Sequence, residues 1–417
     1  MVITLSFPKK LVALLLLTAF NAQASSELVL QLDSSLRYES NPLAFSDRAD
    51  TLSLLGSEIR SDRVLSNDVR FSLTHSLDSS ETRLVFDGQL GQWDYARLTS
   101  LDHNPYVYRT GLEWRAGPLW RGMVFHSQDQ KLFDYQDGSL TERERQFRST
   151  QTIEVALRMT PDVEIPVVLK KQRRHYDLEK NSFNESDEHS VDVGVLWNSE
   201  TTSKMRAGAL SKEIRFTNRT VQQVGVLGAS YRDNELYFEV DWHYSVKTRF
   251  GARLATLRRD YGSLSELNFS APTANFTLDH DYSPMTKIKI EAWSRPLDAT
   301  NTSVVYSMNH GTQLSLRWQA TPKTRLSMQF SKELDRYQAT RSSMGPPNPV
   351  LFRVRKGAGV TYAVSRDLSL YVNSLTQELT QGDLGAAISQ RTLAAGLEYN
   401  FENMSGLAKR LGLGTRR

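Results

Sequence analysis

The stretch that decides the fold class is LAAGLEYNF at residues 393–401. In an extended chain, one face of this stretch carries Leu393, Ala395, Leu397, Tyr399 and Phe401, and the other face carries small or polar residues. An apolar row that ends in two aromatic residues is typical of an outer-membrane β-barrel strand, with one face toward lipid and one toward a polar interior. The stretch therefore predicts a transmembrane strand that closes such a barrel.

The same period of two recurs along most of the chain. The clearest case is residues 236–246, where the apolar residues Leu236, Phe238, Val240, Trp242, Tyr244 and Val246 alternate with polar or half-polar ones. Similar alternation begins near Leu28, Val69, Tyr106, Ile153, Ile288 and Leu314. A period of two over this many segments predicts strands and not helices. A soluble propeller or sandwich is the alternative all-β fold, but no sequence signature repeats as it would in propeller blades.

Tight turns and long polar loops punctuate the strands. Turn residues cluster at 78–80, 116–118, 160–162, 200–202, 233–234, 283–285, 321–323 and 365–367. Longer polar loops are expected at 39–51, 133–147, 177–189 and 337–349. Eight turns, with both termini on the periplasmic side, imply nine up-and-down pairs. We therefore predict an antiparallel up-and-down barrel of about 18 strands, with 16 as the alternative because residues 52–66 are hard to assign.

The first 24 residues have the three parts of a secretory signal. Lys9 and Lys10 precede an apolar core at 11–20, and Ala22-Gln23-Ala24 forms an A-x-A cleavage site. We expect a cleaved signal peptide at 1–24, an outer-membrane barrel at 25–401 and a C-terminal periplasmic tail at 402–417. An uncleaved anchor is the alternative for the signal. The sequence has no cysteine, which excludes an acylated lipoprotein, a disulfide framework and a thiolate metal site.

Charge and hydropathy limit the kinds of molecule with which the chain is expected to interact. The 51 basic and 47 acidic residues give a net charge of +4 and are interleaved along the chain, so no nucleic-acid partner is expected. No apolar run of eighteen residues follows the signal, which excludes a helical membrane protein. The expected environment is the lipid of the bacterial outer membrane.

No motif specifies a catalytic, metal or cofactor site. The best local arrangement is Glu239, Asp241 and His243, which share one face of a predicted strand. A carboxylate two residues from a histidine can fix its tautomer, but ordinary interior residues of a barrel have the same pattern. The chain is therefore predicted not to be an enzyme, and an outer-membrane hydrolase is kept as a remote alternative.

Basic residues recur on the face that alternation turns inward. The candidate pore-lining residues are Arg109, Arg115, Arg158, Lys287, Lys289 and Arg317, with Arg70 in the same pattern. Inward Arg and Lys favour anions, and a mixed charged and aromatic lining suits sugars. Alternatively, they pair with acids such as Glu113, Glu154 and Glu291 and brace a wide barrel. These two roles are compatible. A further basic run, Lys170, Lys171, Arg173 and Arg174, leads toward the loop at 177–189.

Two segments carry a family resemblance. Residues 35–43, followed by Ala49-Asp50-Thr51-Leu52, and the segment 106–124 resemble the EpsL-type family of outer-membrane β-barrel porins associated with exopolysaccharide export. Glu39-Ser40 and the sixteen residues beyond Phe401 depart from that pattern. The resemblance implies a conduit or assembly component for exported capsule or biofilm polysaccharide. Because the barrel begins near Leu28, a separate periplasmic or polysaccharide-export partner protein would have to deliver the polymer. A general or solute-specific porin is the alternative function.

Overall fold

The computed structural model describes residues 26–77, 81–132, 144–199, 202–298, 304–339, 350–381 and 387–402. The expected signal peptide and all of the expected tail except Glu402, which ends the last strand, lie outside these ranges. The described residues form 18 strands: β1 (Ser26–Glu39), β2 (Asp62–Leu77), β3 (Thr82–Tyr95), β4 (Tyr106–Ala116), β5 (Trp120–Leu132), β6 (Arg145–Arg158), β7 (Val163–Tyr176), β8 (Ser186–Asn198), β9 (Lys204–Phe216), β10 (Ser230–Ser245), β11 (Thr248–Asp260), β12 (Phe269–Ser283), β13 (Thr286–Asp298), β14 (Val304–Gln319), β15 (Thr324–Ala339), β16 (Val350–Ala363), β17 (Leu368–Gln381) and β18 (Ala387–Glu402).

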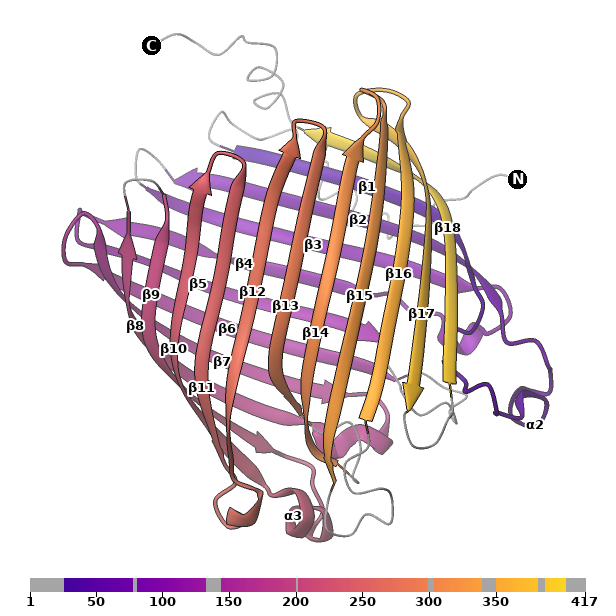
Figure 1. The fold of residues 1–417 in the computed structure, drawn as a ribbon, viewed down its shortest axis with the longest axis horizontal. Coiled ribbons are helices and arrows are strands. Elements are labelled where there is room, and N and C mark those ends of the chain that lie inside the picture. The colour runs from indigo at the N-terminus through magenta and orange to yellow at the C-terminus, as the bar shows by residue number, and fades with distance from the viewer. Residues whose placement is uncertain are drawn as a thin grey trace.

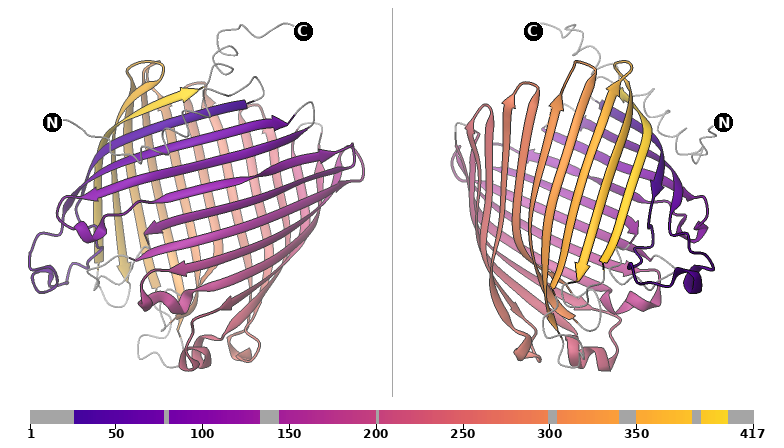
Figure 2. Two further views of the ribbon diagram at one scale, coloured as in Figure 1. Left: turned by 180° about the vertical axis from the view of Figure 1, so that it is seen from behind. Right: turned by 45° about the vertical axis from the view of Figure 1, so that its right-hand side comes forward.

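These strands form one closed barrel. Each strand pairs antiparallel with its neighbours in the sequence, and β1 pairs with β18 from Val29 opposite Glu402 to Glu39 opposite Thr392. Figures 1 and 2 show the resulting cylinder from three sides. The predicted fold is confirmed, and the strand count is 18 and not 16.

The two ends of the barrel differ. The connections at one end are short, such as Val246–Lys247 between β10 and β11. The other end carries the longer loops with helices α2 (Thr51–Leu55) and α3 (Val221–Leu227) and the 3₁₀ turns η1 (Thr99–Leu101), η2 (Glu179–Asn184) and η3 (Ser265–Leu267) (Figure 1). We call these the turn end and the loop end. By the usual rule for such barrels, the turn end faces the periplasm and the loop end faces outward. No helix among the described residues is long and apolar enough to cross a membrane.

One predicted turn was wrong. Asp233-Asn234 lies inside β10, and the turn after this strand is at Val246–Lys247. Asp233 stays extended because its buried carboxylate accepts hydrogen bonds from the guanidinium of Arg259 on β11. The unassigned segment at 52–66 contains α2, a loop and the beginning of β2, which starts at Asp62.

The barrel exterior is apolar, and a belt of aromatic residues surrounds it at the turn end. Exposed apolar side chains run around the described strands, among them Leu84, Val124, Ile153, Leu169, Val193, Leu254, Ile290, Leu314, Met328, Val372 and Leu397. Close to the turns, exposed aromatic side chains include Trp120, Trp197, Trp242, Tyr244, Tyr282, Trp318, Tyr362 and Tyr399. An apolar band edged by aromatic residues is the surface that a transmembrane barrel presents to lipid and to its interface.

The loop end is narrowed from within. Residues 41–45, between β1 and β2, fold inward, so that Leu43 and Phe45 pack with Val64 and Tyr95 on one wall. Ala44 packs with Leu351, Leu379 and Ile388 on the wall formed by β16 to β18. This inward segment is held by Asn41, whose amide donates to the carbonyl of Phe45 at 2.8 Å and accepts from its N–H at 3.0 Å. Ala44 sits at φ +55°, a left-handed conformation that is unusual for a residue other than glycine.

Candidate functional site: the polar interior of the barrel

The interior is lined by ion pairs that link neighbouring strands. On the wall from β3 to β13, they include Arg83–Glu113, Arg121–Glu154, Arg148–Asp129, Lys170–Glu188, Arg206–Asp192 and Arg249–Asp241. The bracing role considered for Glu113, Glu154 and Glu291 is consistent with this arrangement, since each accepts from a nearby cation. Charges neutralised in pairs leave little net field on this wall.

Most of the predicted pore-lining cations belong to such pairs. Arg109 contacts Asp87 at 2.9 Å and covers the ring of Phe125 at 4.5 Å. Arg115 pairs with Glu81 at 2.6 Å, and Arg158 pairs with Glu164 at 3.2 Å.

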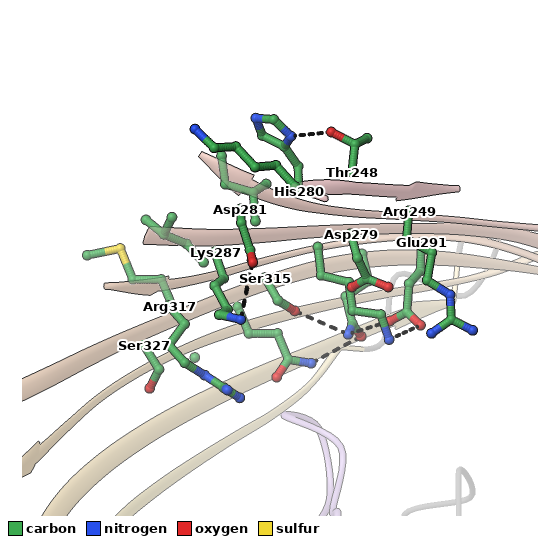
Figure 3. Close-up of a pocket in the computed structure, with 18 of the residues that line it drawn as sticks. Thr248, Arg249, Asp279, His280, Asp281, Lys287, Glu291, Ser315, Arg317 and Ser327 are labelled. Atoms are coloured by element: carbon green, nitrogen blue, oxygen red, sulfur yellow. Dashed lines mark hydrogen bonds and ion pairs between the residues drawn. The ribbon is translucent and has the colours of Figure 1, made fainter. Parts of the chain in front are cut away.

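The remaining three predicted residues come together on adjacent strands. Lys287 and Lys289 of β13 pair with Asp281 at 3.3 Å and Glu291 at 2.8 Å. Arg317 of β14, directly opposite Lys287 in the register, has no ion-pair partner among the described residues. Figure 3 shows its guanidinium extending beside Ser327.

These three cations line a cavity of about 850 Å³ in the interior wall of β10 to β17, near the turn end. The Lys and Arg residues on its lining are Lys247, Arg249, Lys287, Lys289 and Arg317, and the acids are Asp279, Asp281 and Glu291. The difference, five minus three, is +2, and it falls to +1 when Asp241, the partner of Arg249, is included. The cavity therefore has a small cationic excess.

Besides apolar residues such as Ile288 and Leu316, the cavity wall carries many polar but uncharged side chains. Gln329 donates to the side-chain oxygen of Gln313 at 3.1 Å, and Gln313 donates to Glu291 at 3.1 Å. Ser315, Ser327, Gly357, Asn373 and Ser374 continue this surface across β14 to β17. Amide and hydroxyl groups of this kind hydrogen-bond to water or to polar solutes without demanding a charge.

A buried charge cluster at the loop end was missed in the sequence. Arg259, 2% exposed, binds Asp233 through two hydrogen bonds of 2.7 and 2.9 Å and reaches Asp298 at 3.3 Å. Asp298 also accepts from Tyr231 and lies 3.8 Å from Arg174 of β7. The cluster thus ties β7, β10, β11 and β13 together. No local motif indicates this cluster, because the residues that contact one another in it are 26 to 124 positions apart.

The loop over this cluster is also tightly packed. Arg219 donates to the carbonyls of Leu227 and Gly228 at 2.7 and 2.6 Å and stacks on the ring of Phe216. Burial lowers the pKa of Arg219 to about 10. Burial likewise raises the pKa of Tyr261, in the loop after β11, to about 12.

The arrangement considered for catalysis is not assembled. Asp241 is held by Arg249, and Glu239 is held by Arg253 at 3.1 Å. The Nδ1 atom of His243 is buried without a hydrogen-bond partner in the part of the chain that the structure describes. Within those same residues, no group of three His, Asp or Glu side chains is placed to hold a metal ion.

No family model and no curated protein matches this chain. Among solved structures, it is similar to the outer membrane protein opdK from Pseudomonas aeruginosa, with 10% identity over 90% of this chain and 99% of that chain and a TM-score of 0.50. It is also similar to Acinetobacter baumannii OccAB3, with 10% identity over 91% of this chain and 100% of that chain and a TM-score of 0.48. At these identities the likeness concerns the fold. Together with the apolar exterior, this fold places the chain in the outer membrane as a transmembrane β-barrel.

Proposed function

We propose that the barrel is a diffusion channel for small hydrophilic solutes. The observation that carries this proposal is the hollow, polar inner wall of β10 to β17, in a barrel of 18 strands. Barrels of 16 to 18 strands are wide enough to hold an aqueous channel. The inward segment at 41–45 narrows the loop end of this channel, and the ion pairs hold the wall in shape. A channel of this kind needs no chemistry beyond sorting by size and charge, which agrees with the predicted absence of enzymatic activity.

The cationic excess of the cavity favours anions over cations. Arg317 is the main source of this net positive charge, because it has no acidic ion-pair partner among the described residues. Fixed charge on a pore wall sets which ions enter. We expect weak anion selectivity and not a strict filter, since the net excess is only +1 to +2.

Planar-bilayer recordings of the purified protein test this proposal. The expected result is discrete conductance steps with a reversal potential shifted toward anions in a salt gradient. Arg317→Gln should move that potential toward zero, while Arg317→Lys should keep it. Absence of conductance steps from a folded barrel would contradict a diffusion channel.

A second candidate is the conduit or assembly role in exopolysaccharide export that the family resemblance implies. The feature that favours it is the uncharged amide and hydroxyl surface from Gln313 to Asn373. Such a role would also require a periplasmic or polysaccharide-export partner. The same recordings separate the two candidates: block by added oligosaccharide supports the second, and unchanged steps support a general channel.

A further inference from the structure

The outer surface of β7 to β11 carries a concentrated group of basic side chains at the loop end. We call Lys171, Arg173, Arg215, Arg232 and Arg258 the outer basic patch. All five are exposed. Their neighbours in the strands, such as Gln172 and Asp233, are buried and point inward. The patch therefore belongs to the outer face of the barrel and not to the channel.

The register places these side chains on adjacent strands. Lys171 of β7 lies opposite His189, His189 opposite Glu213, and Glu213 opposite Arg232 of β10. One row closer to the loops, Arg173 lies opposite Asp187, and Asp187 lies opposite Arg215. At the spacing of neighbouring strands, β7 to β11 span roughly 19 Å. Figure 1 shows these strands running side by side toward the end that carries α3.

The patch begins immediately beyond the lipid-facing band. Leu169, 46% exposed, is two residues before Lys171, and Leu236, 71% exposed, is four residues after Arg232. Two residues of a strand cover about 7 Å. The patch therefore lies at the depth where the headgroups of the outer leaflet begin, given the orientation expected for the loop end.

The charges of the patch are only partly satisfied within the protein. Its acidic neighbours are Asp187, Glu213 and Asp260, so five cations minus three anions leave an excess of +2. Glu213 is shared by Arg215 at 2.6 Å and Arg232 at 3.3 Å, and Asp187 serves Arg173 at 2.8 Å. Lys171 and Arg258 have no ion-pair partner among the described residues.

The neighbouring outer face differs in character. On β4 to β6, the corresponding positions carry Tyr106, Tyr108, His126, Gln128 and Gln151, none of which is Lys or Arg, and Arg145 at the loop end of β6 is paired with Asp177. Lys332 and Arg336 of β15 are also exposed on the outer face, and Lys356 of the neighbouring β16 lies 3.9 Å from Glu378. The outer basic patch thus differs from these residues in having five exposed cations on neighbouring strands, two of which have no ion-pair partner among the described residues.

We propose that the outer basic patch binds the phosphate groups of lipopolysaccharide, the phosphorylated glycolipid of the outer leaflet. Guanidinium groups match phosphate oxygens in paired hydrogen bonds, and a row of cations at the membrane surface attracts anionic headgroups. The cations stand on four of the five strands from β7 to β11 and spread over more width than one phosphodiester, which favours a headgroup with two separated phosphates. This binding is independent of what passes through the channel.

Lipid titration of the full protein in a neutral detergent, followed by native mass spectrometry, tests the proposal. The double variant Lys171→Gln with Arg258→Gln removes two cations that form no ion pair with the described residues, so the barrel should still fold. Loss of two surface cations predicts roughly 30-fold weaker binding of diphosphoryl lipid A. The matched control, Lys332→Gln with Arg336→Gln, removes the same charge from β15 and should bind as the wild type does.

Two results would overturn the proposal. Equal weakening in the control pair would show that binding follows net charge and not this patch. Equally tight binding of phosphatidylglycerol, which carries one phosphate, would show that the patch does not select the glycolipid. Heat-modifiable migration on gels establishes that each variant is folded before its binding is compared.

Discussion

Replacement of Arg259 by Gln is expected to destabilise the barrel strongly. The guanidinium is 2% exposed and holds Asp233, which is 3% exposed, through two short hydrogen bonds. Removal of one member of a buried ion pair typically costs about 3–5 kcal/mol, because the other charge stays buried. Lys212 remains 3.3 Å from Asp233, and Arg174 remains 3.8 Å from Asp298. These remaining cations put the expected loss near the lower limit, about 3 kcal/mol, or roughly a hundredfold in the unfolding equilibrium.

The assay is urea unfolding of the protein refolded into lipid vesicles, followed by tryptophan fluorescence. Arg83→Gln is the matched control, because Arg83 and Glu113 are 56% and 36% exposed and form a single 3.4 Å contact. An exposed pair of this kind contributes at most about 1 kcal/mol. The double variant Arg259→Gln with Asp233→Asn should recover part of the loss, since it leaves no buried charge at position 233. Equal unfolding midpoints for Arg259→Gln and Arg83→Gln would refute the reasoning.

Three further predictions concern packing, the inward segment and pH. A Cβ at Gly311 would lie 2.2 Å from Trp293, so Gly311→Val should cost about 1–3 kcal/mol in urea unfolding, while Gly225→Ala, with no atom within 4 Å, should not destabilise. Asn41→Ala removes both bonds that hold Phe45 and should raise single-channel conductance by freeing residues 41–45; unchanged conductance would show that this segment does not limit the passage. Burial raises the pKa of Tyr261 to about 12. The stability that the neutral hydroxyl of Tyr261 gives to the folded barrel is therefore present below pH 10 and is lost as pH rises toward 12. Between pH 10 and pH 12, the free energy of unfolding of Tyr261→Phe should therefore rise by about 2–3 kcal/mol relative to that of the wild type. A difference between the two proteins that stays constant with pH would argue against the raised pKa of Tyr261.

The barrel could be predicted because its signals are local and repeated. The alternation at residues 393–401 and 236–246 depends only on the two-residue period of a strand, and both segments form strands with the expected apolar faces outward. The turn at Ser283-Pro284-Met285 is marked by residues suited to tight bends, and β12 ends and β13 begins around it. Periodicity therefore identified the strands, and the count of 18 came from eight turns, of which the one at 233–234 was misplaced by about twelve residues from the turn at Val246–Lys247.

Other features depend on contacts between distant residues. Asp233-Asn234 has the composition of a turn, and only the contact with Arg259 on the next strand shows why it is extended. The charge of the cavity could not be predicted for the same reason. Alternation places Lys287, Lys289 and Arg317 on one face. Which of these cations lacks an acidic partner depends on the positions of Asp281 and Glu291. The inward segment at 41–45 lacks any periodic signal, since it packs against walls more than 300 residues away as well as nearby ones.

The pairing of the first strand with the last has a consequence for biogenesis. Every sheet of fewer than 18 strands built from this chain has two open edges, with unpaired N–H and C=O groups beside an apolar outer face. Such an intermediate can add strands from another molecule as readily as from its own chain. Protection from self-association therefore comes only when β18 docks on β1, and until then the growing sheet must be shielded by other proteins or by the membrane itself.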